Sequence, residues 1–153
     1  MIPASTHTQA ADMPRGIARF AALMIVFLFT VTAGVSTSCA STSWYSNFDS
    51  AVRSAKSSNK AVFLVIAREG CPACSQMERN LSQAGSRRAL QGAVKVRVES
   101  SHNPALSSRF AAAGTPTTVI FSPGNYQSPV YQYTGVMDTS TIRQIGRSID
   151  SFH

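Results

Sequence analysis

Cysteine is scarce in this sequence, with three among 153 residues. Cys39 follows an apolar segment near the N terminus, so the remainder of the chain has only Cys71 and Cys74. Two cysteines three positions apart close a loop too short to stabilise a fold by restricting the unfolded chain. The scarcity therefore excludes a scaffold held together by disulfides, and it favours a chemical role for the close-spaced pair.

Acidic residues are also few, with seven Asp and Glu against 14 Lys and Arg, which gives a net charge of +7. The basic residues are scattered, and only Arg87 and Arg88 are adjacent. Because no basic run resembles a surface that follows a phosphate backbone, we expect no nucleic-acid partner. With 44% hydrophobic and 14% charged residues, the chain is not disordered as a whole, and its length suits a single domain.

The first 40 residues have the pattern of an export signal. Arg15 and Arg19 precede an uncharged stretch over residues 20–35, and small polar residues follow it up to Ala40. This order matches the basic, apolar and cleavage regions of a signal peptide, with cleavage expected after Ala40. We therefore predict that residues 41–153 form a domain outside the cytoplasm, most simply in a periplasm.

Two other fates of this segment stay open. An uncleaved anchor over residues 20–35 is one, although its 16 residues fall below the roughly 20 that a membrane span needs. Lipidation of Cys39 is the other, although Ser36 stands where lipoprotein signals usually have an aliphatic residue. The domain is secreted, membrane-anchored or a lipoprotein under these alternatives, and all three export it.

Helical and strand patterns alternate through the rest of the chain. The most distinct is residues 61–67 (AVFLVIA), an apolar run typical of a strand buried on both faces. The patterns predict further strands over 93–98, 117–121 and 130–133, and helices that open near Trp44, at Pro72 and Pro104, and before Ile142. Gly85 and Gly92 interrupt the second helical pattern, and Gly114 follows the third. This order predicts an α/β layer sandwich with a mixed sheet.

The two cysteines stand where the first strand gives way to a helix. Cys71 immediately precedes Pro72, which suits a first helical turn, whereas Cys74 lies inside the helix on the face of Met77 and Leu81. Unpaired N–H groups and the helix dipole favour a thiolate at Cys71. We therefore expect Cys71 to attack disulfides and the more buried Cys74 to resolve the mixed disulfide.

The Cys-Pro-Ala-Cys motif after an apolar strand, Gly114-Thr115-Pro116-Thr117 before another strand, and Gly135 before the last helix resemble the thioredoxin superfamily. The resemblance extends from Trp44 to Phe152. It implies a thioredoxin-like three-layer sandwich, in which a mixed four-stranded sheet is flanked by helices. It also implies a cis bond before Pro116, a loop in which Thr115 and Pro116 bind extended substrate, and tuning of the redox pair by Pro72 and Ala73.

The sequence departs from the family pattern at three places. Gly70 replaces the tryptophan usual before the first cysteine, and Val65 replaces a buried aspartate that relays protons to the second. Glu69 is nearer to the cysteines, but we expect it to face solvent. The dipeptide Pro72-Ala73 lacks the histidine of strong periplasmic oxidants, so an intermediate reduction potential is expected.

These observations predict an exported thiol–disulfide oxidoreductase acting on proteins, with no cofactor and with a membrane redox partner that resets it. The alternative is a redox-inactive thioredoxin-fold module that binds proteins or acts as a chaperone. A zinc site is disfavoured, because zinc needs four ligands and only His102 and His153 could supplement the cysteine pair. The residues predict neither the direction of exchange nor the substrate proteins.

Overall fold

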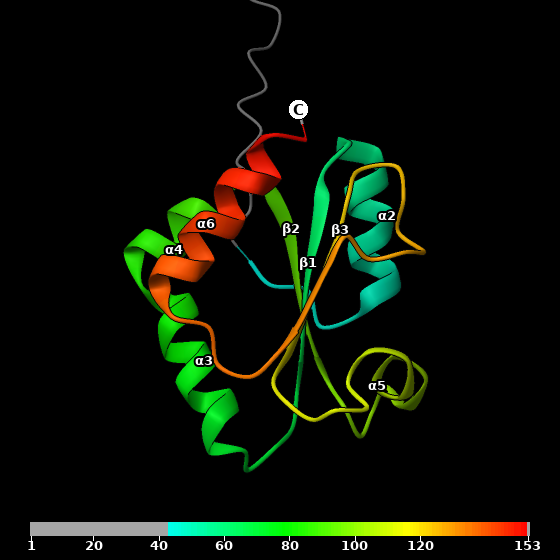
Figure 1. The fold of residues 1–153 in the computed structure, drawn as a ribbon. Helices are drawn as coiled ribbons and strands as arrows, with labels where there is room; N and C mark the ends of the chain where they lie inside the picture. The colour runs from blue at the N-terminus through cyan, green and yellow to red at the C-terminus, as the bar shows by residue number, and fades with distance from the viewer. Residues whose placement is uncertain (1–42, 153) are drawn as a thin grey trace, which may run out of the picture. The chain divides into compact units, whose positions relative to one another are not determined.

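A four-stranded mixed sheet forms the centre of residues 43–152, the part of the chain that the computed structural model describes (Figure 1). One edge strand pairs in parallel with its neighbour, and the other two strand pairs are antiparallel. In spatial order the strands are β2 (Ala93–Glu99), β1 (Ala61–Ala67), β3 (Thr117–Phe121) and β4 (Tyr131–Thr134). This sheet confirms the predicted mixed topology.

Helices cover both faces of the sheet, so the fold has three layers (Figure 1). Every residue of β1 is buried, as its uninterrupted apolar run predicts. Its even-numbered residues pack in one core, and Ala61, Phe63 and Val65 pack in the other. Ala67, at the end of the strand, packs with the two cysteines. One face carries α2 (Phe48–Ser58) and α5 (Pro104–Phe110), and the other carries α3 (Pro72–Ser82), α4 (Ala84–Ala89) and α6 (Thr139–Asp150).

The first described helix begins later than the sequence pattern predicts, and Trp44 lies outside it. The side chain of Asn47 accepts a hydrogen bond from the N–H of Ser50 at 2.9 Å, which caps the helix and fixes its start at Phe48. Upstream, Tyr45 runs alongside β2, donating to the carbonyl of Lys95 and accepting from Arg97 N–H. The prediction for Trp44 is wrong because pairing with a strand and capping outweigh helical spacing.

Other boundaries also differ from the predicted ones, and β2 is one residue longer than predicted. The second helical pattern is broken at Gln83, whose extended backbone separates α3 from α4, while Gly85 lies within α4. The short helix α5 ends at Phe110, three residues before the predicted end. The ladder of β4 begins at Tyr131 and is therefore displaced by one residue from the predicted span.

The packing of α4 against α6 depends on the absence of a side chain at Gly146, which is buried. A Cβ atom there would collide with the carbonyl oxygen and Cβ of Ala89. We expect Gly146→Ala to lower the free energy of unfolding by about 1–3 kcal/mol, measured by urea denaturation. Gly85→Ala is the matched control, because its Cβ would find Arg143 at an ordinary 3.7 Å. This control should leave stability within about 1 kcal/mol of the parent or raise it; equal effects of the two substitutions would refute the packing argument.

The N-terminal predictions concern residues outside the described part of the chain. They include the signal peptide or anchor over 1–40, the apolar stretch over 20–35, and Cys39. Among the helices of residues 43–152, none combines the length and apolar character required to cross a membrane.

Candidate active site

The turn that follows β1 places Cys71 at the start of α3. Gly70 has a φ of +68°, a left-handed conformation that favours glycine, and Cys71 is extended and caps the helix. Pro72 occupies the first helical turn, where its missing N–H leaves no hydrogen bond unmade. The predicted junction between strand and helix is therefore confirmed.

Cys71 and Cys74 form a disulfide, with their Cα atoms 5.2 Å apart. Both are buried, with exposed fractions of 6% and 3%, so burial separates the two cysteines less than expected from the sequence. Ala73 packs against the pair, whereas Pro72 is exposed. The difference between the two sulfurs therefore comes from the polar groups around each of them.

The sulfur of Cys71 lies among groups that could stabilise a thiolate. The backbone N–H of Cys74 donates to Cys71 Sγ at 3.1 Å. This N–H is one of the donors that the first turn of a helix leaves without an intrahelical partner. Because hydrogen bonds to an anion are stronger than those to a neutral sulfur, reduction of the disulfide would strengthen this contact. The geometry supports Cys71 as the attacking residue.

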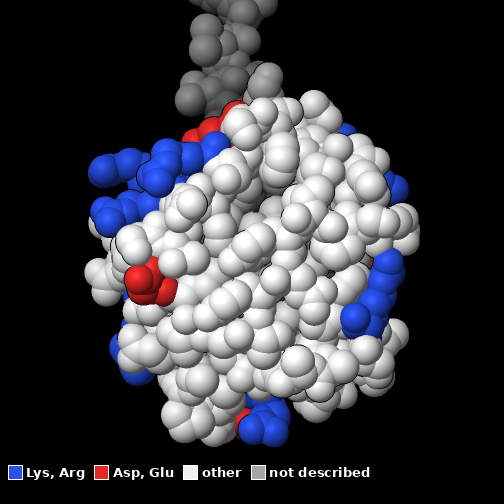
Figure 2. Space-filling model, viewed as in Figure 1, with Lys and Arg blue, Asp and Glu red and all other residues white. Residues whose placement is uncertain are grey.

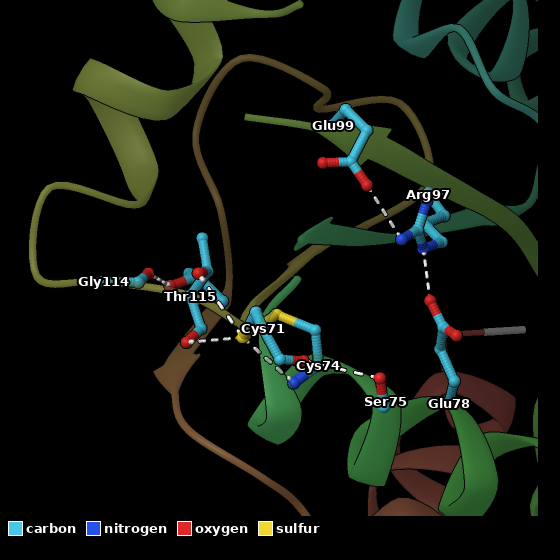
Figure 3. Close-up of a disulfide and its surroundings, with 9 residues drawn as sticks. Cys71, Cys74, Ser75, Glu78, Arg97, Glu99, Gly114 and Thr115 are labelled. Carbon is cyan, nitrogen blue, oxygen red and sulfur yellow. Dashed lines mark hydrogen bonds and ion pairs between the residues drawn. A yellow bond between two sulfur atoms is a disulfide. The ribbon is translucent and has the colours of Figure 1, made fainter. Parts of the chain in front are cut away.

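The loop before β3 brings Thr115 to the same sulfur (Figure 3). The Thr115 carbonyl oxygen lies 3.8 Å from Cys71 Sγ, and its hydroxyl oxygen lies 3.9 Å away. The bond between Thr115 and Pro116 is cis, as the family resemblance implies, and Pro116 is buried. The structure therefore brings together Cys71, Cys74 and the predicted substrate loop, which are distant in sequence.

A charged network that the sequence did not predict lies near Cys74. Arg97 places its Nε 2.7 Å from a Glu78 carboxylate oxygen and its terminal nitrogen 2.9 Å from Glu99 (Figure 3). In the sheet register Arg97 stands directly beside the buried Val65. Basic and apolar residues alternate in β2, and this alternation indicates which face Arg97 occupies. Nothing in the local sequence indicates that its carboxylate partner is Glu78 on α3. Glu69 is exposed, as expected.

Metal ligands do not gather in this part of the molecule. Across residues 43–152, no group of three or more His, Cys, Asp or Glu side chains is positioned to hold an ion. His102 is exposed in the turn before α5. The described site is therefore built from two sulfurs, backbone groups and one threonine.

Comparison with known proteins agrees with this geometry. Residues 43–123 match the sequence profile of the thioredoxin-like family. Curated protein sequences give no match. Similar solved structures include a thioredoxin from Thermus thermophilus, with 24% identity and a TM-score of 0.60, covering 70% of this chain and 85% of that one. Chloroplastic thioredoxin z has 21% identity and a TM-score of 0.56, with coverage of 71% and 95%.

A third similar structure is Trxlp from Edwardsiella tarda EIB202, with 20% identity and a TM-score of 0.56, covering 67% of this chain and 97% of that one. At these identities, the likeness to solved structures shows the shared fold. The family profile spans more than half of the chain and includes both Cys71 and Cys74. The chain therefore belongs to the thioredoxin-like family, and a Cys71–Cys74 pair on this fold supports thiol–disulfide oxidoreductase activity.

Proposed function

We propose that this chain exchanges disulfides with protein substrates outside the cytoplasm, through Cys71 as nucleophile and Cys74 as resolving residue. The observation that carries the proposal is the position of the Thr115 backbone against the sulfur of Cys71. A substrate that lies along this backbone would present its own sulfur to the attacking cysteine. Pro116, which follows in the loop, shapes the floor of that groove.

An extended polypeptide suits this loop. Within residues 43–152, neither the N–H nor the carbonyl of Thr115 pairs with another backbone group. Unpaired main-chain groups beside a sheet are the groups to which an added peptide strand binds. A protein segment in extended conformation could therefore pair with Thr115 while its cysteine reaches Cys71.

Exchange proceeds through two sulfur transfers. The Cys71 thiolate attacks one sulfur of a substrate disulfide, forming a mixed disulfide and releasing the other substrate sulfur as a thiolate. The Cys74 thiolate then attacks Cys71 Sγ, forming the intramolecular disulfide and releasing the second substrate thiolate, which takes up a proton. Read in reverse, the same steps oxidise a substrate dithiol. Continued turnover needs a partner that resets the pair, and for an exported protein we assign that task to a membrane redox protein.

Export is tested by expressing the chain in a host with a periplasm and determining the compartment in which the mature protein is found. We expect the full chain to be recovered there with its N terminus at Ser41, and a variant lacking residues 20–35 to stay in the cytoplasm. Cell fractionation locates the full chain and the variant, and mass spectrometry identifies the N-terminal residue of the recovered protein. A membrane-bound product that carries a lipid on Cys39, or that retains residues 20–35, would identify the lipoprotein or anchored form. Recovery of the full chain in the cytoplasm would contradict export.

A further inference from the structure

A cavity of about 550 Å³ lies beside the disulfide, among residues of β2, α3 and α4. Cys74, Pro116 and Val65 of β1 line its wall, and Val65 is the register partner of Arg97 on β2. Its volume falls within the range of pockets that hold small molecules, roughly 300–1,000 Å³. Neither Cys71 nor Thr115, where the attack on substrate is proposed, lines this cavity.

Positive charge predominates around the cavity. Arg87, Arg88, Lys95 and Arg97 line it, and Glu78 supplies the one carboxylate in the lining. Glu78 is already paired with Arg97, which also binds Glu99. Within residues 43–152, Arg87, Arg88 and Lys95 have no carboxylate partner. Figure 2 shows basic side chains gathered on the side of the molecule where Figure 1 places α4 and α6.

Lys95 is the most unusual of these cations, because its residue is only 6% exposed. Burial lowers the pKa of Lys95 below its ordinary value, and the nearby positive charge of Lys60 lowers it further. Lysines are seldom so buried unless an opposite charge compensates them. An anion in the cavity would supply that compensation and favour the charged form of the lysine.

Apolar side chains line much of the cavity. Trp44, Leu81 and Leu90 line it, and the Trp44 ring packs edge-on against Phe63 with ring centres 6.2 Å apart. A pocket that combines apolar walls with a few converging charges is typical of sites for organic molecules. The walls therefore suit a ligand with a carbon skeleton.

We propose that this cavity binds a small organic anion with two or more carboxylates, whose charges lie against Lys95, Arg87 and Arg88 and whose carbon skeleton lies against Trp44. The ligand would sit next to Cys74. Pro116 borders both the cavity and the substrate groove, but neither Cys71 nor Thr115 lines the cavity, so ligand binding there can be measured independently of the proposed exchange with proteins.

Trp44 is the single tryptophan of the chain, so its fluorescence reports directly on this cavity. We expect citrate, added to the oxidised full chain, to change Trp44 emission saturably with a dissociation constant below about 1 mM. Sodium chloride at matched ionic strength and triethyl citrate, which lacks the charges, should give no saturable change. Absence of saturation with citrate, or equal binding of triethyl citrate, would overturn the proposal.

Substituted variants distinguish citrate binding in this cavity from non-specific attraction of citrate to a basic protein. We expect Arg87→Ala/Arg88→Ala to weaken citrate binding roughly tenfold or more, because two charged contacts are lost. Lys95→Met should weaken it similarly, with thermal unfolding used to verify that the variant folds. The control is Arg143→Ala/Arg147→Ala, which removes two exposed charges from α6 outside the cavity. Equal weakening in this control would show non-specific attraction and refute the site.

Discussion

Cys74→Ser should accumulate mixed disulfides between Cys71 and substrate proteins, because the variant retains the attacking sulfur but lacks the one that releases it. Thr115 and the N–H of residue 74 would still lie at Cys71 Sγ in this variant. We expect adducts that disappear on reduction to be abundant when the variant is expressed with its export segment. Non-reducing electrophoresis followed by mass spectrometry would identify the trapped proteins and the cysteine that holds them.

The matched variant for trapping is Cys71→Ser. It keeps Cys74, which is 3% exposed and has no contact with Thr115 among those described. We therefore expect few or no adducts from it. Comparable trapping by both variants would contradict the assigned roles, and absence of adducts from either would favour the redox-inactive binding module.

Cys71→Ser should also abolish catalysed reduction of a model protein disulfide, leaving only the uncatalysed background. A serine hydroxyl does not supply the thiolate that attacks a disulfide, and no other described cysteine lies beside Thr115. The fold should persist, since loss of so short a disulfide loop removes little restriction from the unfolded chain. Insulin reduction with dithiothreitol as electron donor measures turnover, and circular dichroism verifies folding on the same preparation.

Cys39→Ser provides the control for turnover, because it makes the same chemical change at the third cysteine. We expect the purified Cys39→Ser chain to reduce insulin at the parental rate. A folded Cys71→Ser protein that retained most of the parental rate would show that exchange does not pass through Cys71.

The sequence predicted those parts of the fold that local pattern determines. The apolar run of β1 and the proline after Cys71 fixed a strand, a turn and a helix start in the places observed. The helix start at Phe48 was missed because Tyr45 pairs with β2, a contact between segments distant in sequence. The break at Gln83 was also missed, since neither glycine nor proline occupies that position.

The active site, like the fold, could be predicted from the sequence only in part. The positions of Cys71 and Cys74 followed from their spacing and from the helix start, whereas the approach of Thr115 followed only from the family resemblance. Apolar and basic residues alternate in β2, and Lys95 and Arg97 lie on one face of it. This alternation could not show that α3 and α4 enclose this face, because the packing of layers depends on the whole chain. The cavity beside Cys74 was therefore visible only in the structure.

The reduction potential of the Cys71–Cys74 pair tests most directly whether the disulfide is a working redox centre. The purified chain would be equilibrated in a series of thiol–disulfide buffers, its free thiols alkylated, and each cysteine quantified by peptide mapping, which distinguishes Cys39. We predict a single two-electron transition of Cys71 and Cys74 between about −270 and −120 mV, where exchange-active pairs lie. A pair that stays oxidised below about −300 mV, as structural disulfides do, or that never forms a disulfide in the series, would contradict the account.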